Sequence, residues 1–145
     1  MKDLEDRFEL DRFVKAQEGS VETALAEIRC GRKRSHWMWY VFPQLAGLGQ
    51  SAMSFRYGIR NEEEARAYLN HPILGRRLHD CAEAILAVEG RSARDILGSP
   101  DDLKLKSCAT LFAHVSPPGS HFERILDKYY SSERDPKTLA LVAKA

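Results

Sequence analysis

The sequence predicts an all-α fold: a single globular domain over residues 1–145, arranged as a compact bundle of about seven or eight short helices with one irregular, glycine-containing wrapped loop. Apolar residues recur at helical spacing along most of the chain, and residues typical of helix caps stand between these segments. No segment shows the apolar and polar alternation of a half-buried strand. A length of 145 residues suits one domain with a continuous core.

Two helices that form a hairpin are predicted before residue 31. The positions that share one face of the first helix are Leu10, Phe13, Val14 and Gln17. The apolar face of the second helix consists of Val21, Ala24, Leu25 and Ile28. We expect Ser20 to cap the second helix and Gly31 to follow its end.

The middle of the chain predicts a capped helix, a long central helix and a short one. Asn61 followed by three glutamates is typical of a helix N-terminus, and Glu62 is placed to pair with Arg66. After a break at residues 71–72, the apolar stripe of the central helix is Leu74, Leu78, Cys81, Ile85 and Val88. Ser92 and Gly98 bracket the short helix.

Three further helices are predicted toward the C-terminus. Ser99 is expected to cap the first of them, with Pro100 at its first position. In that helix, Asp102 and Lys106 are placed for an ion pair, and residues 116–119 end it. We expect the last two helices to begin at Ser120 and at residues 135–136.

Charge and composition exclude several classes of function. The 22 basic and 21 acidic residues give a formal net charge of +1, so the chain as a whole has no strong attraction to nucleic acid or to anionic membranes. No apolar run is long enough to span a membrane, and the N-terminus lacks the apolar core of a signal peptide, so the protein is expected to be cytoplasmic. The sequence gives no indication of its oligomeric state.

The three cysteines are expected to be reduced core residues. Cys30, Cys81 and Cys108 are odd in number and lie at apolar helical positions. The histidines show no zinc-binding spacing, so neither a metal nor a cofactor is predicted. The chain also lacks a phosphate-binding P-loop and a nucleophile elbow.

Aromatic and basic side chains are concentrated in residues 32–44, which contain both tryptophans. Ser35 is predicted to cap a short helix that runs to Phe42 and is stopped by Pro43. Backbone N–H groups at such a helix start, beside the basic run at residues 32–34, are suited to a phosphate or a carboxylate. The candidate ligand-binding residues are Arg32, Lys33, Arg34, Ser35, His36, Trp37, Trp39, Gln44, Arg56 and Lys104.

Arg56 is included because residues 54–60 again interleave cations with aromatics, which makes them a candidate second wall of the same pocket. The candidate catalytic residues are His36 as a general acid and Asp101 or Asp102 as a general base. A solvated helix face explains the acids and lysines of residues 101–106 equally well. The tryptophans also fit a core-facing stripe, which is the more common role of aromatic side chains.

Five stretches of the chain carry a resemblance to a known family. They are residues 12–17 (RFVKAQ), 31–45 (GRKRSHWMWYVFPQL), 68–75 (YLNHPILG), 101–105 (DDLKL) and 110–112 (TLF). On these stretches the chain resembles a bacterial family catalogued as domain of unknown function 1810, whose members have sometimes been labelled calpastatin. The resemblance implies a compact, mainly helical fold and carries no activity. The chain departs from the family pattern at Cys108-Ala109, where a serine and a methionine are expected.

These observations favour a protein that binds a small phosphorylated or nucleotide-like ligand in a basic and aromatic cleft. If it is an enzyme, the favoured reaction is hydrolysis of an N-glycosidic bond, because stacking, phosphate anchoring and a carboxylate suffice without a metal. A distant likeness to proteins that handle ADP-ribose or cleave such bonds points the same way. The alternative is a non-catalytic interaction module, in which the exposed part of the aromatic segment docks a protein partner.

Overall fold

The computed structural model describes residues 6–144, and these contain ten α-helices and no β-strand. The predicted all-α class is therefore confirmed, with more helices than expected; seven of the ten have at least seven residues. The helices are α2 (Asp11–Gln17), α3 (Ser20–Arg29), α4 (Met38–Val41), α5 (Ala52–Tyr57), α6 (Glu62–Asn70), α7 (Leu74–Ala87), α8 (Ala93–Leu97), α9 (Asp101–His114), α10 (His121–Tyr129) and α11 (Pro136–Lys144).

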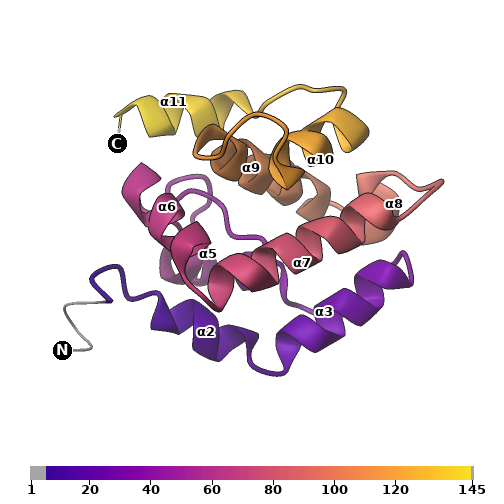
Figure 1. The fold of residues 1–145 in the computed structure, drawn as a ribbon, viewed down its shortest axis with the longest axis horizontal. Helices are drawn as coiled ribbons and strands as arrows, with labels where there is room; N and C mark the ends of the chain where they lie inside the picture. The colour runs from indigo at the N-terminus through magenta and orange to yellow at the C-terminus, as the bar shows by residue number, and fades with distance from the viewer. Residues whose placement is uncertain (1–5, 145) are drawn as a thin grey trace.

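Helix α7 runs through the middle of the molecule, as its long apolar stripe predicted. It packs against α3 on one side and α10 on the other, and α6 crosses its N-terminal end (Figure 1). Its stripe residues Leu74, Leu78 and Ile85 are buried. Gly75 permits the close crossing of α6, because a Cβ atom there would lie 2.1 Å from the carbonyl oxygen of Leu69. Buried side chains from α2, α4, α6, α8, α9 and α10 complete the core.

Most predicted helix caps are present. Asn61 accepts the backbone N–H of Glu64, Ser120 accepts that of Glu123, and Ser92 forms a reciprocal capping box with its helix. Ser20, in contrast, is the first residue of α3, because Gly19 makes the turn before it at φ +78°.

The start of α9 differs from the prediction. Pro100, and not Ser99, flanks the helix, which begins at Asp101. Asp102 does not pair with Lys106, whose ammonium group contacts Glu133. The Oδ1 atom of Asp102 is instead buried with no hydrogen-bond partner among residues 6–144.

The region between α3 and α6 contains two short helices where the sequence predicted one. The predicted helix at residues 35–42 is reduced to α4, and residues 52–57 form α5, capped by Ser51. Between them the chain wraps back, and an isolated parallel bridge pairs Leu45 with Ile59. The weak apolar periodicity of residues 46–58 explains why α5 was predicted as loop.

A fully buried carboxylate, that of Glu64, ties this region to α2. It accepts hydrogen bonds from the Arg12 side chain at 2.8 Å, from the Arg60 side chain at 3.2 Å and from the Arg60 backbone N–H at 2.9 Å. Arg12 also donates to the carbonyl groups of Arg56 and Gly58. A buried charge must be paired in this way to be tolerated, so these contacts fix the positions of α2, α5 and α6.

The carboxylate of Glu27, on α3, fixes the segment that precedes α4. It accepts the backbone N–H groups of Arg34 and Ser35 at 2.9 and 3.0 Å, the Ser35 hydroxyl at 2.6 Å and the Trp37 indole N–H at 2.9 Å. Partial burial raises the pKa of Glu27, but the hydrogen bonds together lower it by more. The net result is a pKa of about 2, below the ordinary value of 4.5. Ser35 therefore does not cap a helix: it binds a carboxylate of the protein itself.

The three cysteines do not share one environment. Cys81 and Cys108 are buried as predicted, but the prediction for Cys30 is wrong because it lies exposed just beyond the last residue of α3. Burial raises the pKa of Cys81 to about 12 and that of Cys108 well above its ordinary value. The two buried thiols are thus held in their unreactive protonated form.

We expect a thiol reagent to label the native protein once, at Cys30, and to label Cys81 and Cys108 only after unfolding. The reason is that the reagent needs access to a thiolate, which the two buried residues do not provide. Mass spectrometry of labelled peptides measures this directly. Rapid labelling of Cys108 in the folded protein would contradict the packing of α9.

Replacing Leu111 by alanine should lower the free energy of unfolding by about 2–5 kcal/mol, because the fully buried side chain would leave a cavity. Leu103 lies on the same helix with 59% of its surface exposed, so Leu103→Ala is the matched control, with an expected change within about 0.5 kcal/mol. Urea unfolding measures both. Equal losses in the two variants would show that the face of α9 is wrongly assigned.

We expect Glu27→Gln to lower the free energy of unfolding at neutral pH by about 1–3 kcal/mol, because an amide cannot accept from four donors as a carboxylate does. The pKa in the folded state lies below its ordinary value of 4.5, so the carboxylate stabilises the fold above that pH. Its contribution is lost as the pH falls from 4.5 toward 2. The difference between wild type and variant should therefore shrink over that range.

Urea unfolding at a series of pH values measures this difference. Glu18→Gln is the control, because Glu18 is exposed and its side chain has no partner among residues 6–144. A Glu27→Gln effect that does not change with pH would contradict the assigned role of the carboxylate.

Candidate functional site

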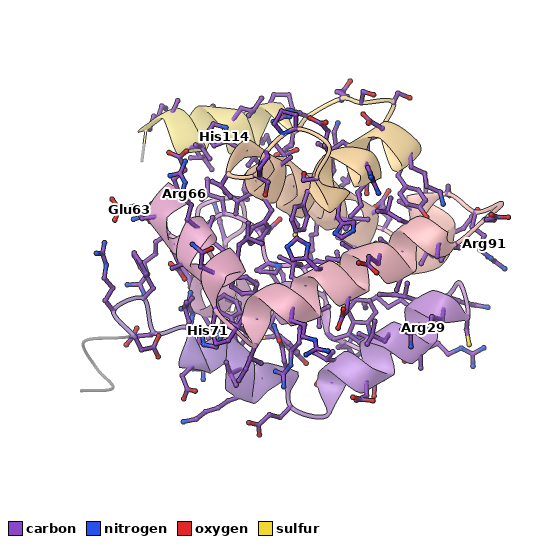
Figure 2. The ribbon with its side chains drawn as sticks, in the orientation of Figure 1. Arg29, Glu63, Arg66, His71, Arg91 and His114 are labelled. Atoms are coloured by element: carbon purple, nitrogen blue, oxygen red, sulfur yellow. The ribbon has the colours of Figure 1, made fainter. Side chains whose placement is uncertain are left out.

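A cationic pocket of about 530 Å³ lies where the turn after α3 meets α8. Figure 2 shows Arg91, one of its lining residues, at one end of the long axis of the molecule, with Glu63 at the opposite end. The residues that line the pocket are Arg32, Lys33, Arg91, Arg94, Asp95, Ile96, Leu97 and Gly98. Four of them are cationic and one is acidic, although the chain as a whole has a net charge of only +1.

Local backbone geometry brings the two halves of the pocket together. Gly31 turns the chain after α3 with φ +77°, a conformation that favours glycine. A Cβ atom at Gly31 would lie 3.1 Å from Cδ and Nε of Arg91, so the absence of a side chain lets the stem of Arg91 pack over the turn. The backbone N–H of Lys33 then donates to the carbonyl oxygen of Ile96 at 2.7 Å, which joins the turn to α8.

The cations of the pocket are not equivalent. Arg32, Arg91 and Arg94 are exposed, and within residues 6–144 their side chains make no ion pair or hydrogen bond. The Lys33 side chain is only 10% exposed and its Nζ lies 3.0 Å from Oδ2 of Asp101. Asp95 completes the capping box of α8 by accepting the backbone N–H of Ser92, and this hydrogen bond, with a smaller contribution from nearby Arg91, lowers the pKa of its carboxyl group. Three guanidinium groups are therefore available to an external anion.

Asp101 connects the pocket to the aromatic segment. Its Oδ1 atom lies 3.2 Å from Nζ of Lys104, which in turn stands 3.7 Å above the ring of Trp39. Lys33 approaches the ring of Trp37 in a similar way, at 5.2 Å. The structure thus places Asp101 and Lys104 against the aromatic segment, but with both carboxylate oxygens held by ammonium groups.

Several candidate residues of the aromatic segment are not available to a ligand. Trp37 is 1% exposed and Gln44 is 8% exposed, so both belong to the core. The backbone N–H groups of Arg34 and Ser35 are already occupied by Glu27. The turn at Ser35, predicted to bind an external anion, instead binds the carboxylate of Glu27 on α3.

The remaining candidates lie apart from the pocket. His36 is exposed, and among residues 6–144 no hydrogen bond or ion pair joins its ring to an aspartate. Asp102 lies beside Tyr130, whose hydroxyl donates to its carbonyl oxygen. Arg56 lines a different pocket of about 390 Å³, together with Arg12 and Arg60. The predicted acid and base are therefore not brought together, and Arg56 is not a second wall of the cationic pocket.

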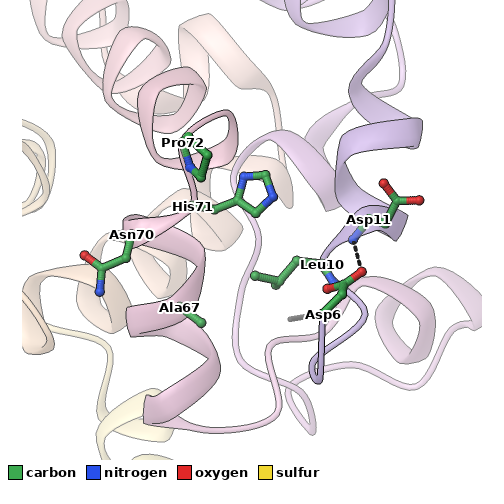
Figure 3. Close-up of a pocket in the computed structure, with 7 residues that line it drawn as sticks. All are labelled: Asp6, Leu10, Asp11, Ala67, Asn70, His71 and Pro72. Carbon is green, nitrogen blue, oxygen red and sulfur yellow. Dashed lines mark hydrogen bonds between the residues drawn. The ribbon is translucent and has the colours of Figure 1, made fainter. Parts of the chain in front are cut away.

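Figure 3 shows another pocket, of about 520 Å³, between the start of α2 and the junction of α6 with α7. Asp6 and Asp11 lie on one side of it and His71 on the other. These groups have partners in the fold: Asp6 accepts two backbone N–H groups at the start of α2, and His71 accepts the backbone N–H groups of Ile73 and Leu74. With two carboxylates and no cation in its lining, this pocket is poorly suited to a phosphate.

Arg91 and Arg94 were missed by sequence analysis. They lie in a short stretch between two predicted helices, where arginine is common on solvated surfaces, and only the packing of that stretch on the Gly31 turn places them beside Arg32. The described part of the chain contains no group of three or more residues able to hold a metal ion. None of the helices in residues 6–144 has the length and apolarity to cross a membrane.

Comparisons with known proteins agree with the resemblance seen in the sequence. The family model described as protein of unknown function (DUF1810) matches residues 7–142. The crystal structure of the conserved hypothetical protein Rv1873 from Mycobacterium tuberculosis is similar, with 51% identity and a TM-score of 0.93; the match covers 95% of this chain and 99% of that one. A search of curated proteins gave no match. The helical fold and this extensive match together show that the chain belongs to the DUF1810 family of proteins of unknown function.

Proposed function

We propose that the cationic pocket binds a small phosphorylated or nucleotide-like ligand. The observation that carries this proposal is the convergence of three guanidinium groups that make no ion pair or hydrogen bond within residues 6–144, Arg32 from one segment and Arg91 and Arg94 from another. Clustered guanidinium groups repel one another, and a bound anion relieves that repulsion. A phosphate group is the natural partner, because the planar guanidinium group donates two parallel hydrogen bonds to it.

The size and lining of the pocket fit the rest of such a ligand. A volume of about 530 Å³ lies within the usual range for small-molecule sites. Ile96 and Leu97 are the apolar residues of the lining and are largely buried, and Asp95 supplies a carboxylate that can accept from the hydroxyl groups of a sugar. No aromatic ring lines the pocket, so a base would stack on a guanidinium plane and not on a tryptophan.

The geometry supports binding more than hydrolysis of an N-glycosidic bond. That reaction needs a carboxylate that is free to activate water. Asp101 is held by two ammonium groups and Asp95 completes the capping box of α8, so both have structural roles. The interaction-module alternative is also less well supported, because Trp39 and Tyr40 remain half-buried in the aromatic segment.

We expect calorimetry to detect binding of a nucleoside monophosphate or a sugar phosphate, and no binding of the matching nucleoside. The double variant Arg91→Ala, Arg94→Ala should weaken binding by at least about tenfold, because each charge-assisted hydrogen bond contributes about 1.5–3 kcal/mol. Its melting temperature should stay nearly unchanged, since exposed charges contribute little to stability. Affinity should also fall as salt is added.

Arg56→Ala is the matched control, because Arg56 is also exposed but lines a different arginine-containing pocket. The affinity of Arg56→Ala for the same ligand should equal that of the wild type. If Arg56→Ala weakens binding and the double variant does not, the ligand binds beside Arg12 and Arg60 and the proposal is wrong. Release of a free base from a nucleotide would show instead that the site is catalytic.

A further inference from the structure

Two histidines face each other between α7 and α10, outside the cationic pocket. The Nδ1 atom of His79 lies 3.0 Å from the Nδ1 atom of His121, and their ring centroids are 5.2 Å apart with an interplanar angle of 61°. At this distance at most one of the two nitrogens carries a proton that points to the other. In the neutral pair, therefore, at least one Nδ1 lone pair is directed at its partner.

Both rings are held in place by their surroundings. The ring of His79 packs on buried Phe122, with 5.3 Å between centroids. The Nε2 atom of His121 lies 3.4 Å from Oε1 of Glu83, one turn after His79 on α7. A proton on Nε2 is favoured by that carboxylate, which leaves Nδ1 of His121 as the atom with the lone pair. Partial burial, and then the neighbouring His121, lower the pKa of His79 from its ordinary value of 6.5.

We propose that His79 and His121 form a site for a divalent transition-metal ion, such as Zn²⁺, bound through the two Nδ1 atoms. Two nitrogen ligands at about 2.1 Å from one ion, with an angle of roughly 90–109° between them, are about 3.0–3.4 Å apart. The observed separation of 3.0 Å already meets this condition. Imidazole is a preferred ligand of Zn²⁺, Cu²⁺ and Ni²⁺, which defines the class of ion.

Binding needs no net loss of protons from the neutral pair. The proton shared between the two Nδ1 atoms moves through solvent to Nε2 of the ring that carried it, and that ring becomes the second ligand. Glu83 acts as a positioning residue that orients His121 through its other nitrogen, the arrangement common around metal-bound histidines. The His121 side chain is 25% exposed, so solvent reaches the site and water completes the coordination. The ion would cross-link α7 to α10.

The test is a calorimetric titration of the chelator-treated full chain with Zn²⁺. Wild type is expected to bind one ion, with affinity at least about tenfold greater than that of His79→Gln or His121→Gln. Glu83→Gln should weaken binding by a smaller factor, since it removes only the orienting contact. His114→Gln is the matched control, because His114 also contacts a carboxylate, that of Glu62, but is paired with no second imidazole in the part of the chain that the structure describes.

Thermal unfolding gives a second readout: Zn²⁺ should raise the melting temperature of wild type and His114→Gln and leave that of the two pair variants unchanged. If a pair variant fails to fold, nitrogen NMR of the wild type provides the test. Zn²⁺ bound between the two rings should shift the Nδ1 resonances of both His79 and His121. Three results would overturn the proposal: equal Zn²⁺ affinity in the wild type and the folded pair variants, no Zn²⁺ binding at all, or resonance shifts confined to one ring. The first or last of these results would indicate an adventitious ion only.

Discussion

The carboxylate of Glu27 determines how the aromatic segment lies against α3. Four donors from residues 34–37 converge on it, so the turn has a single arrangement in which its polar groups are satisfied. With the indole N–H of Trp37 bonded to Glu27, the ring of that tryptophan can be buried without leaving a polar atom unpaired. The same turn directs Lys33 toward Asp101 and leaves Arg32 facing the pocket.

Charge pairing divides the cations of this region into two groups. Lys33 and Lys104 share Asp101 and are largely buried beside the tryptophan rings, so they stabilise the packing of the segment on α9. The three arginines beside the pocket have no such partner within the described residues. An anion that enters the pocket meets three guanidinium groups that have no ion-pair partner within 4 Å among residues 6–144 and outnumber the one acid of the lining, Asp95, which favours the pocket over the tryptophans as the ligand site.

The parts of the fold that the sequence predicted correctly are those whose signals are local. The caps at Asn61, Ser92 and Ser120 act within three residues, and the stripe of α7 repeats within one helix. The site was only partly predictable: Arg32 and Lys33 line the pocket, but their neighbours Arg91 and Arg94 are brought there by tertiary packing. The turn at Ser35 has the properties expected of an anion site, yet nothing near it in sequence shows that Glu27 fills it.

We infer that internal carboxylates satisfy the turn at Ser35 and the two lysines beside the tryptophans, and that an external anion binds where three arginines converge without an ion pair among residues 6–144. A crystal soaked in tungstate, a heavy tetrahedral anion that mimics phosphate, tests it directly through anomalous scattering. We expect the strongest peak between Arg32, Arg91 and Arg94, with the Glu27 contacts intact. A peak that displaces Glu27 from the turn at Ser35, or one found only beside Arg12, Arg56 and Arg60, would contradict it.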